Sequence, residues 1–166
     1  MVTDAVRLLL FPALMAFAAS SDFFTMTISN RVSLLLVAGF FALALYTGMS
    51  LQAVMWHSGA ALTVLAVTFT FFACGWIGGG DAKLAAATVL CLGFDHLAAY
   101  LLYASIFGGV LTLAVIRFRL MALPATLAER DWVQRLHKID GGVPYGIALA
   151  AAALLVYPDT AWMQPG

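Results

Sequence analysis

Apolar residues form six long runs along the chain, separated by short polar connections. None of the runs alternates apolar and polar residues, as the strand of a membrane β-barrel would. Helices satisfy their backbone hydrogen bonds internally, which favours them in hydrocarbon. The pattern therefore predicts an all-α, polytopic membrane protein with about six transmembrane helices, at residues 5–19, 32–46, 53–74, 82–94, 97–116 and 143–157.

The only long polar connection, 117–142, lies between the fifth and sixth runs. Its segment "ATLAERDWVQRLHKID" places Leu127, Trp132 (with Val133) and Leu136 near one helical stripe, with charges elsewhere. This spacing is typical of an amphipathic helix that lies at a membrane surface. The "GGVPYG" that follows predicts a turn into the sixth run.

The composition agrees with a membrane protein. Of 166 residues, 64% are apolar and only 10% are charged, whereas soluble domains carry about 25% charged residues. We therefore expect 1–166 to form a single integral-membrane domain. The net charge of zero gives no overall field for nucleic acid. Cys74 and Cys91 lack CxxC spacing and the three histidines lack ligand spacing, so we expect neither a metal nor a cofactor.

Basic residues predict the orientation of the chain. The connections after the first, third and fifth runs hold seven of the eight, namely Arg31, Lys83, Arg117, Arg119, Arg130, Arg135 and Lys138. Cytoplasmic loops carry such an excess, so these connections are predicted to face the cytoplasm and both termini to lie outside. Arg7 and the "AFAAS" of the first run also allow a cleaved signal peptide, but a retained helix fits the six-run pattern better.

Two carboxylates stand out against this topology. Asp22 closes the first run and Asp81 opens the fourth, so the chain crosses the membrane twice between them and both lie on the same side. Two neighbouring carboxyl groups cannot both ionise easily, so one keeps its proton and can act as a general acid beside a general base. The alternative interpretation is that each aspartate caps a helix terminus.

Three glycines directly precede Asp81. Gly78, Gly79 and Gly80 weaken a helix, so we expect an open, irregular backbone that an extended substrate approaches closely, as in strand addition. At membrane depth such backbone occurs where it is buried in protein or lines a water-filled cavity. Lys83 is either a cytoplasmic anchor or a group that tunes the two carboxylates.

Two motifs carry a family resemblance. The stretch "GGGDAKL" resembles the GxGDxKL motif of type IV prepilin peptidases, the bacterial branch of the GxGD membrane aspartic proteases. In "SDFFTMTISNRVS", Asp22, Ile28, Asn30 and Arg31 follow the family's first motif, with Ser29 in place of its proline. The stretch "GGVPYGIALA" also resembles the start of the family's last span, so the resemblance covers nearly the whole chain.

The resemblance implies an aspartic endopeptidase that removes the short basic leader of type IV prepilins, with Asp22 and Asp81 as catalytic residues. We also expect Gly78, Gly79, Gly80, Asn30 and Lys83 to contact the substrate. Larger members carry a cytoplasmic domain with two CxxC pairs that is associated with N-methylation. This chain has no such insert and resembles the small peptidase of tight-adherence (Flp-type) pili.

The expected location is the bacterial inner (cytoplasmic) membrane, with the site facing the cytoplasm. The expected partners are a prepilin and the lipid bilayer, and no nucleic acid. One alternative is a GxGD protease for other membrane substrates. Another is a transporter or assembly scaffold whose aspartates bind protons or cations. A transporter should carry acids at mid-span, and here both lie at span ends, which favours the peptidase.

Overall fold

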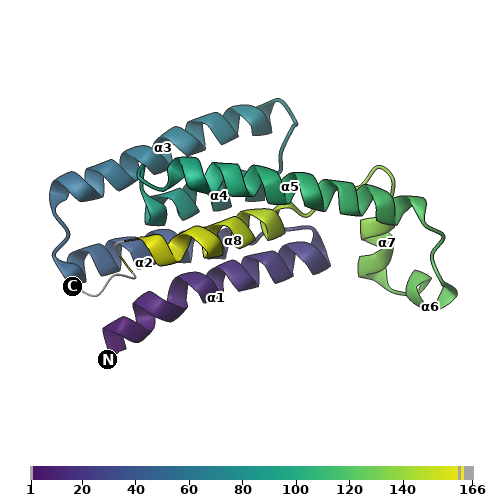
Figure 1. The fold of residues 1–166 in the computed structure, drawn as a ribbon, viewed down its shortest axis with the longest axis horizontal. Coiled ribbons are helices and arrows are strands. Elements are labelled where there is room, and N and C mark those ends of the chain that lie inside the picture. The colour runs from purple at the N-terminus through teal and green to yellow at the C-terminus, as the bar shows by residue number, and fades with distance from the viewer. Residues whose placement is uncertain (1, 161, 163–166) are drawn as a thin grey trace.

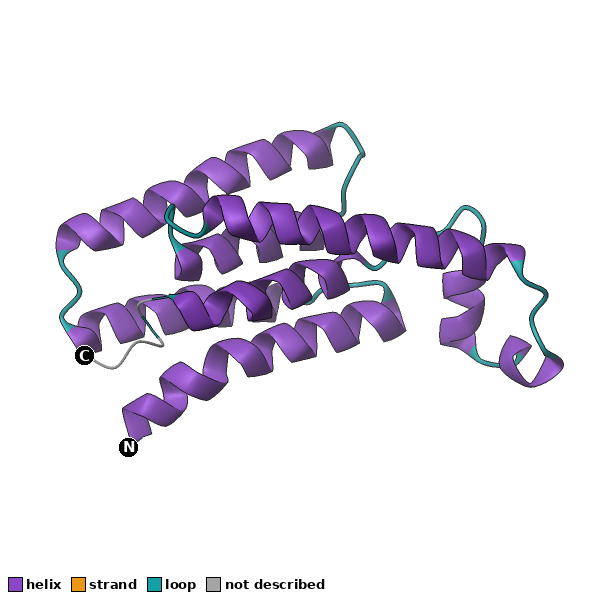
Figure 2. Ribbon diagram, in the orientation of Figure 1, coloured by secondary structure: helices purple, strands orange, loops and turns teal. Residues whose placement is uncertain are grey.

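The computed structural model describes residues 2–160 and 162, and the regular structure in this part of the chain is helical (Figures 1 and 2). Each of the six predicted apolar runs forms a helix, which confirms the all-α class. The helices are α1 (Val2–Thr25), α2 (Asn30–Thr47), α3 (Leu51–Ala73), α4 (Gly79–Leu92), α5 (Leu97–Leu120), α6 (Ala125–Ala128), α7 (Asp131–His137) and α8 (Tyr145–Val156), with a 3₁₀ turn at Tyr157–Asp159.

Among the described residues, three segments are long and apolar enough to cross a membrane: Leu8–Thr25, Leu51–Ala73 and Leu97–Leu120. Asn30–Tyr46 and Tyr145–Asp159 are apolar but shorter. The chain is therefore a membrane protein. The count of six spans and the outward placement of the termini stay predictions.

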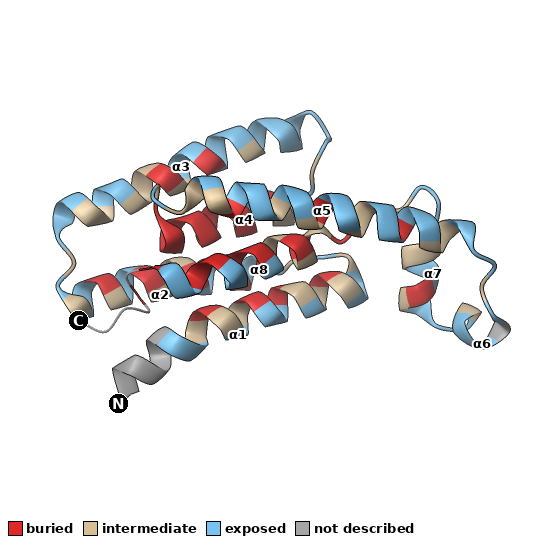
Figure 3. Cartoon of the chain, viewed as in Figure 1, coloured by how far each residue is buried: buried red, intermediate tan, exposed pale blue. Residues whose placement is uncertain are grey.

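Helix α4 forms the centre of the bundle. It packs against α2, α3 and α8, while α1 and α5 pack against α8. Figure 3 shows buried positions concentrated on α4 and α8, whereas α3 is largely exposed. Small residues permit this close packing of backbones, as is usual between membrane helices. They include Ala85, Ala86 and Ala87 of α4 and Ala148, Ala150, Ala152 and Ala153 of α8, all buried.

The connections gather at two ends of the bundle (Figure 1). One end carries the α1–α2 and α3–α4 connections and the long connection from α5 to α8, and the other carries the α2–α3 and α4–α5 connections. Asp22 and Asp81 lie at the first of these ends, as the count of crossings predicted. The seven basic residues of the odd connections belong to the same end.

The expectation of one amphipathic helix after α5 was wrong. The segment forms two short helices, α6 and α7, because the backbone of Arg130, the N-cap residue of α7, is extended (φ −90°, ψ 118°). The Gln134 side-chain amide donates a hydrogen bond to the Ala128 carbonyl, which stabilises the break. Of the predicted stripe, Val133 is buried and Leu127 is exposed.

The expectation of irregular backbone throughout the glycine run was also wrong. Gly79 and Gly80 form the first turn of α4, and only Gly78, the N-cap residue, is extended (φ −72°, ψ 145°). Close packing explains these glycines better than backbone freedom does. A Cβ at Gly80 would lie 3.1 Å from the Ile28 Cβ, and one at Gly79 would lie 3.2 Å from the Phe72 ring.

Candidate active site

Asp22 lies in the last turn of α1 and is only 5% exposed. Its Oδ2 accepts a hydrogen bond from the backbone N–H of Gly146, at 2.7 Å. Helix α1 then ends at Thr25, and Met26 adopts a left-handed φ of 55° that turns the chain into the α1–α2 loop. The Ser21 hydroxyl donates to the Thr27 carbonyl at 2.9 Å, which holds this loop against the helix beside Asp22.

Gly146 is a site residue that the sequence reasoning missed. It lies in the first turn of α8, where backbone N–H groups have no helical acceptor and the helix dipole is positive. A Cβ at this position would lie 2.8 Å from Asp22 Oδ2 and 2.7 Å from Ile28 Cδ1. No side chain fits there, so glycine is required for the contact with Asp22. A glycine directly after the "VPY" turn was the available signal.

Asp81 is the third residue of α4, and its carboxylate folds back onto the first turn. The backbone N–H of Gly78 donates a hydrogen bond to this carboxylate and so favours its charged form, as in one half of a capping box. Burial, and after it the charge of Asp22, outweigh this contact and raise the pKa of Asp81 to about 7. Asp81 therefore holds a proton for a large fraction of the time at neutral pH.

The two carboxyl groups meet where α4 and α8 begin. Ile28 of the α1–α2 loop lies between these helix starts, against Gly80 on one side and Gly146 on the other. Each aspartate faces a helix N-terminus, in agreement with the capping interpretation, and the charge of Asp22 contributes to the raised pKa of Asp81. The catalytic interpretation stays a prediction. A carboxyl pair that is largely shielded from water and holds one proton is suited to activating water against an amide.

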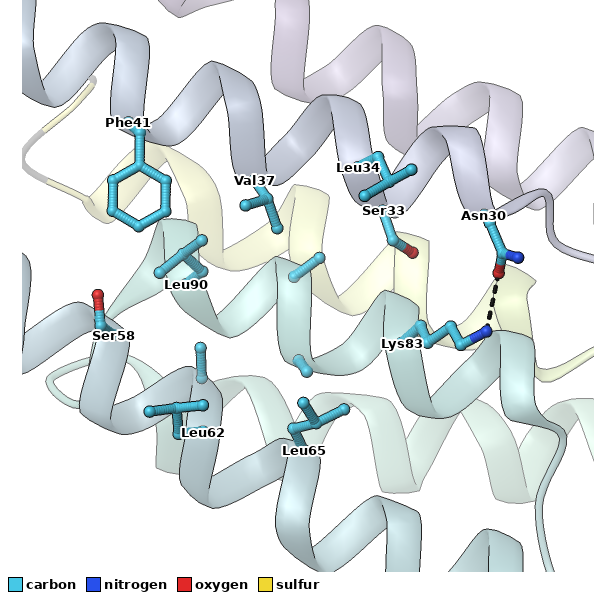
Figure 4. A pocket seen from close by; sticks show the side chains of 13 residues that line it. Asn30, Ser33, Leu34, Val37, Phe41, Ser58, Leu62, Leu65, Lys83 and Leu90 are labelled. Carbon is cyan, nitrogen blue, oxygen red and sulfur yellow. Dashed lines mark hydrogen bonds between the residues drawn. The ribbon is translucent and has the colours of Figure 1, made fainter.

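Asn30 and Lys83 lie together but apart from the carboxyl pair. Lys83 Nζ donates to Asn30 Oδ1 at 3.0 Å (Figure 4). Lys83 follows Asp81 by two residues, so it points to the other side of α4. Both line one end of an apolar groove of about 520 Å³ that α2 and α3 form over α4. Lys83 is not among the groups that shift the pKa of Asp81, which favours the anchor over the tuning role.

Ser29 has a structural role in the α1–α2 loop. It is the N-cap residue of α2, and its hydroxyl accepts a hydrogen bond from the Arg31 backbone N–H at 3.3 Å. Serine is a preferred residue at this position. The replacement of the motif's proline therefore leaves a defined start to α2.

Comparison with known proteins adds one finding. The model of the type IV leader peptidase family matches residues 9–113, which include both aspartates and the loops that carry them. No curated protein and no solved structure matches the chain. The match covers well over half of the sequence, and it contains both aspartates but not Gly146. The chain therefore belongs to the type IV leader peptidase family.

Proposed function

We propose that this protein is an aspartic endopeptidase that removes the basic leader of a type IV, Flp-like prepilin, with Asp22 and Asp81 as its catalytic pair. One observation carries the proposal: a buried carboxyl group, Asp22, and a partly buried one, Asp81, come from distant segments to the same end of the bundle, and the pKa of Asp81 is raised to about 7. The family membership supports peptidase chemistry in a membrane protein.

The two aspartates have different environments, which suggests different roles. Asp22 accepts the Gly146 N–H and acts as the ionised general base that takes a proton from water. Asp81 holds a proton and donates it to the oxygen of the scissile carbonyl as water attacks the carbon. Asp22 then gives its new proton to the leaving nitrogen as the C–N bond breaks, and the Asp81 carboxylate takes a proton back from a hydroxyl of the tetrahedral intermediate, which restores both groups.

The substrate contacts that we propose follow from the start of α4. A scissile peptide must be extended, because a helix hides its carbonyls in internal hydrogen bonds. Gly78 is extended, and the N–H groups of the first helical turn at Gly79 and Gly80 have no helical acceptor, so they can bind the unwound leader junction. Asn30 and Lys83 would contact substrate farther from the carboxyl pair, at the end of the α2–α3 groove.

The location that we propose is the bacterial inner membrane with the active site facing the cytoplasm. The basic residues of the odd connections support this orientation, and they belong to the end of the bundle that holds the aspartates. A prepilin would present its basic leader to the same end. The absence of a CxxC insert supports a small, Flp-type peptidase.

The test is cleavage of a candidate Flp-type prepilin by the purified protein, with the products read by mass spectrometry. We expect loss of a short basic leader, and no product from Asp22→Asn or Asp81→Asn at equal protein level. Asp95→Asn, in the exposed α4–α5 turn, is the matched control and should cleave normally. Normal cleavage by either dyad variant would exclude the proposed mechanism. Cleavage of other membrane proteins but not of prepilins would favour the broader GxGD protease.

A further inference from the structure

The hydrogen bond to Asp22 depends on a residue that follows a long connection. Gly146 comes after α6, α7 and the turn into α8, and it must bring one N–H to 2.7 Å from a buried carboxylate. A connection of this length does not fix such a position by itself. Contacts from α5 supply the missing restraint.

Arg119, in the last turn of α5, binds this connection at three points. Its Nε donates to the Leu136 carbonyl at 2.9 Å and its Nη2 to the Gly142 carbonyl at 2.7 Å, while Nη1 lies 3.5 Å from the Ile139 carbonyl. The Leu136 carbonyl belongs to the last turn of α7, where carbonyls have no helical donor. The guanidinium is planar with five N–H donors, so one side chain can hold three carbonyls in a fixed arrangement.

Gly141 shows how closely the connection is packed around this arginine. A Cβ at Gly141 would lie 3.0 Å from the Lys138 carbonyl oxygen, 3.1 Å from that of Arg135 and 3.3 Å from Arg119 Nη2. The chain therefore wraps around the guanidinium with no room for a side chain. Three residues after Gly142, the chain enters α8.

A second contact from α5 holds the first residue of α8. The Thr112 hydroxyl lies 2.7 Å from the Gly108 carbonyl and 2.9 Å from the Tyr145 hydroxyl. Threonine has one hydroxyl proton, which it donates to Gly108, so the Tyr145 hydroxyl is the donor to Thr112. Gly108 leaves space for the Tyr145 ring, which would lie 3.4 Å from a Cβ there. Tyr145 and Gly146 are adjacent, so this bond restrains the N–H that reaches Asp22.

We propose that Arg119 is a positioning residue for the catalytic carboxylate: it fixes the connection after α7 so that the start of α8 presents the Gly146 N–H to Asp22. Tyr145, through Thr112, acts in the same way from the other side of Gly146. The proposal rests on the proposed function, because it assigns Arg119 a part in the work of Asp22. It also separates Arg119 from Arg117, Arg130, Arg135 and Lys138 of the same connection, for which we propose no role beyond orientation.

The experiment compares Arg119→Gln with Arg117→Gln in cleavage of a prepilin that the wild-type protein processes. Arg117 lies on the same helix two residues earlier and is exposed, so its variant removes an equal charge from the same end. We expect Arg119→Gln to lower kcat about tenfold with little change in KM, since small displacements of reacting groups carry costs of this size. Arg119→Lys should not restore kcat, because a single ammonium group cannot replace the planar fork.

Further measurements separate positioning from folding and from charge. Tyr145→Phe should lower kcat in the same direction as Arg119→Gln, without a change of charge. The acidic limb of the kcat/KM profile should move to higher pH in both variants, because the ionised form of the base loses its N–H donor. If Arg119→Gln melts at a lower temperature than the wild type, its loss of kcat could come from unfolding. The kcat and the pH profile of Tyr145→Phe then decide between positioning and folding.

Wild-type kcat in both Arg119→Gln and Tyr145→Phe would overturn the proposal, as would full rescue by Arg119→Lys or an equal loss in Arg117→Gln. None of these results would affect the proposed function, which depends on Asp22→Asn and Asp81→Asn. Conversely, cleavage by those two variants would remove the proposed function whatever Arg119 does.

Discussion

Replacement of Gly146 by alanine tests the geometry of the site most directly. The new Cβ would lie 2.8 Å from Asp22 Oδ2, 3.0 Å from Asp22 Cβ and 2.7 Å from Ile28 Cδ1. Ordinary contacts of this kind are about 3.5–4.0 Å, so the start of α8 and Asp22 must separate by several tenths of an ångström or more. The present 2.7 Å hydrogen bond from Gly146 to Asp22 would then lengthen or break.

The size of the effect follows from that bond. A hydrogen bond to a charged group contributes about 1.5–3 kcal/mol, and each 1.36 kcal/mol of barrier is a factor of ten. We therefore expect kcat for leader cleavage to fall by about 10- to 150-fold in Gly146→Ala. Overpacking should also lower the free energy of unfolding, by about 1–3 kcal/mol.

The assay is kcat on a prepilin at equal protein level, together with the melting temperature in detergent. Gly109→Ala is the control, because a Cβ at Gly109 has nothing within 4 Å. Adding Ile28→Val to Gly146→Ala shortens one of the two groups that the new methyl meets. It should recover part of the stability but not kcat. Wild-type kcat in Gly146→Ala would refute the reasoning, since the contact with Asp22 would then be dispensable.

Three other predictions concern groups around the site. Because the pKa of Asp81 is raised to about 7 in the folded protein, the stability from its protonated form is present below about pH 4 and is lost as pH rises through 7. The melting temperature should accordingly fall from pH 5 to pH 8, and Asp81→Asn should flatten this dependence; an equal slope in the variant would contradict the assignment. Lys83→Met should leave the pH–rate profile unchanged, because Lys83 faces Asn30 and not the carboxyl pair, and a shifted profile would reinstate a tuning role. Gly80→Val should lower both the amount of protein in the membrane and the rate of cleavage, the latter at least tenfold, because the new side chain meets Ile28. Gly79→Ala meets only the movable Phe72 ring and should cleave within about threefold of the wild type. A Gly80→Val protein that accumulates fully and cleaves normally would contradict the packing argument.

The parts of the fold that follow from chain-wide patterns could be predicted from the sequence. Long apolar runs give the helices, and counting crossings brings Asp22 and Asp81 to one end regardless of orientation. Residues at helix ends follow local rules as well: Ser29 and Ser50 accept hydrogen bonds from the first turns of α2 and α3, as serine at an N-cap usually does.

The parts that depend on packing between distant segments could not be predicted. Gly80 is a poor helix former, yet it lies in the first turn of α4, where a larger residue would press against Ile28. The need for glycine at position 146 is visible only once α1 lies beside α8. Similarly, the periodicity of the segment after α5 fits one helix. The break at Arg130 is stabilised by Gln134, whose side chain donates a hydrogen bond to a backbone carbonyl of the preceding helix, a contact that periodicity does not reveal.

The position of Gly146 in the chain has a consequence for the order in which the enzyme becomes active during synthesis. Both aspartates belong to helices that emerge early, while the N–H that binds Asp22 belongs to the last helix of the bundle. A nascent chain that has inserted α1 to α5 carries both carboxyl groups but lacks this donor. On the proposed mechanism, we therefore expect a partly inserted chain to cleave neighbouring membrane proteins far more slowly than the complete bundle, and full activity to begin when α8 has entered it.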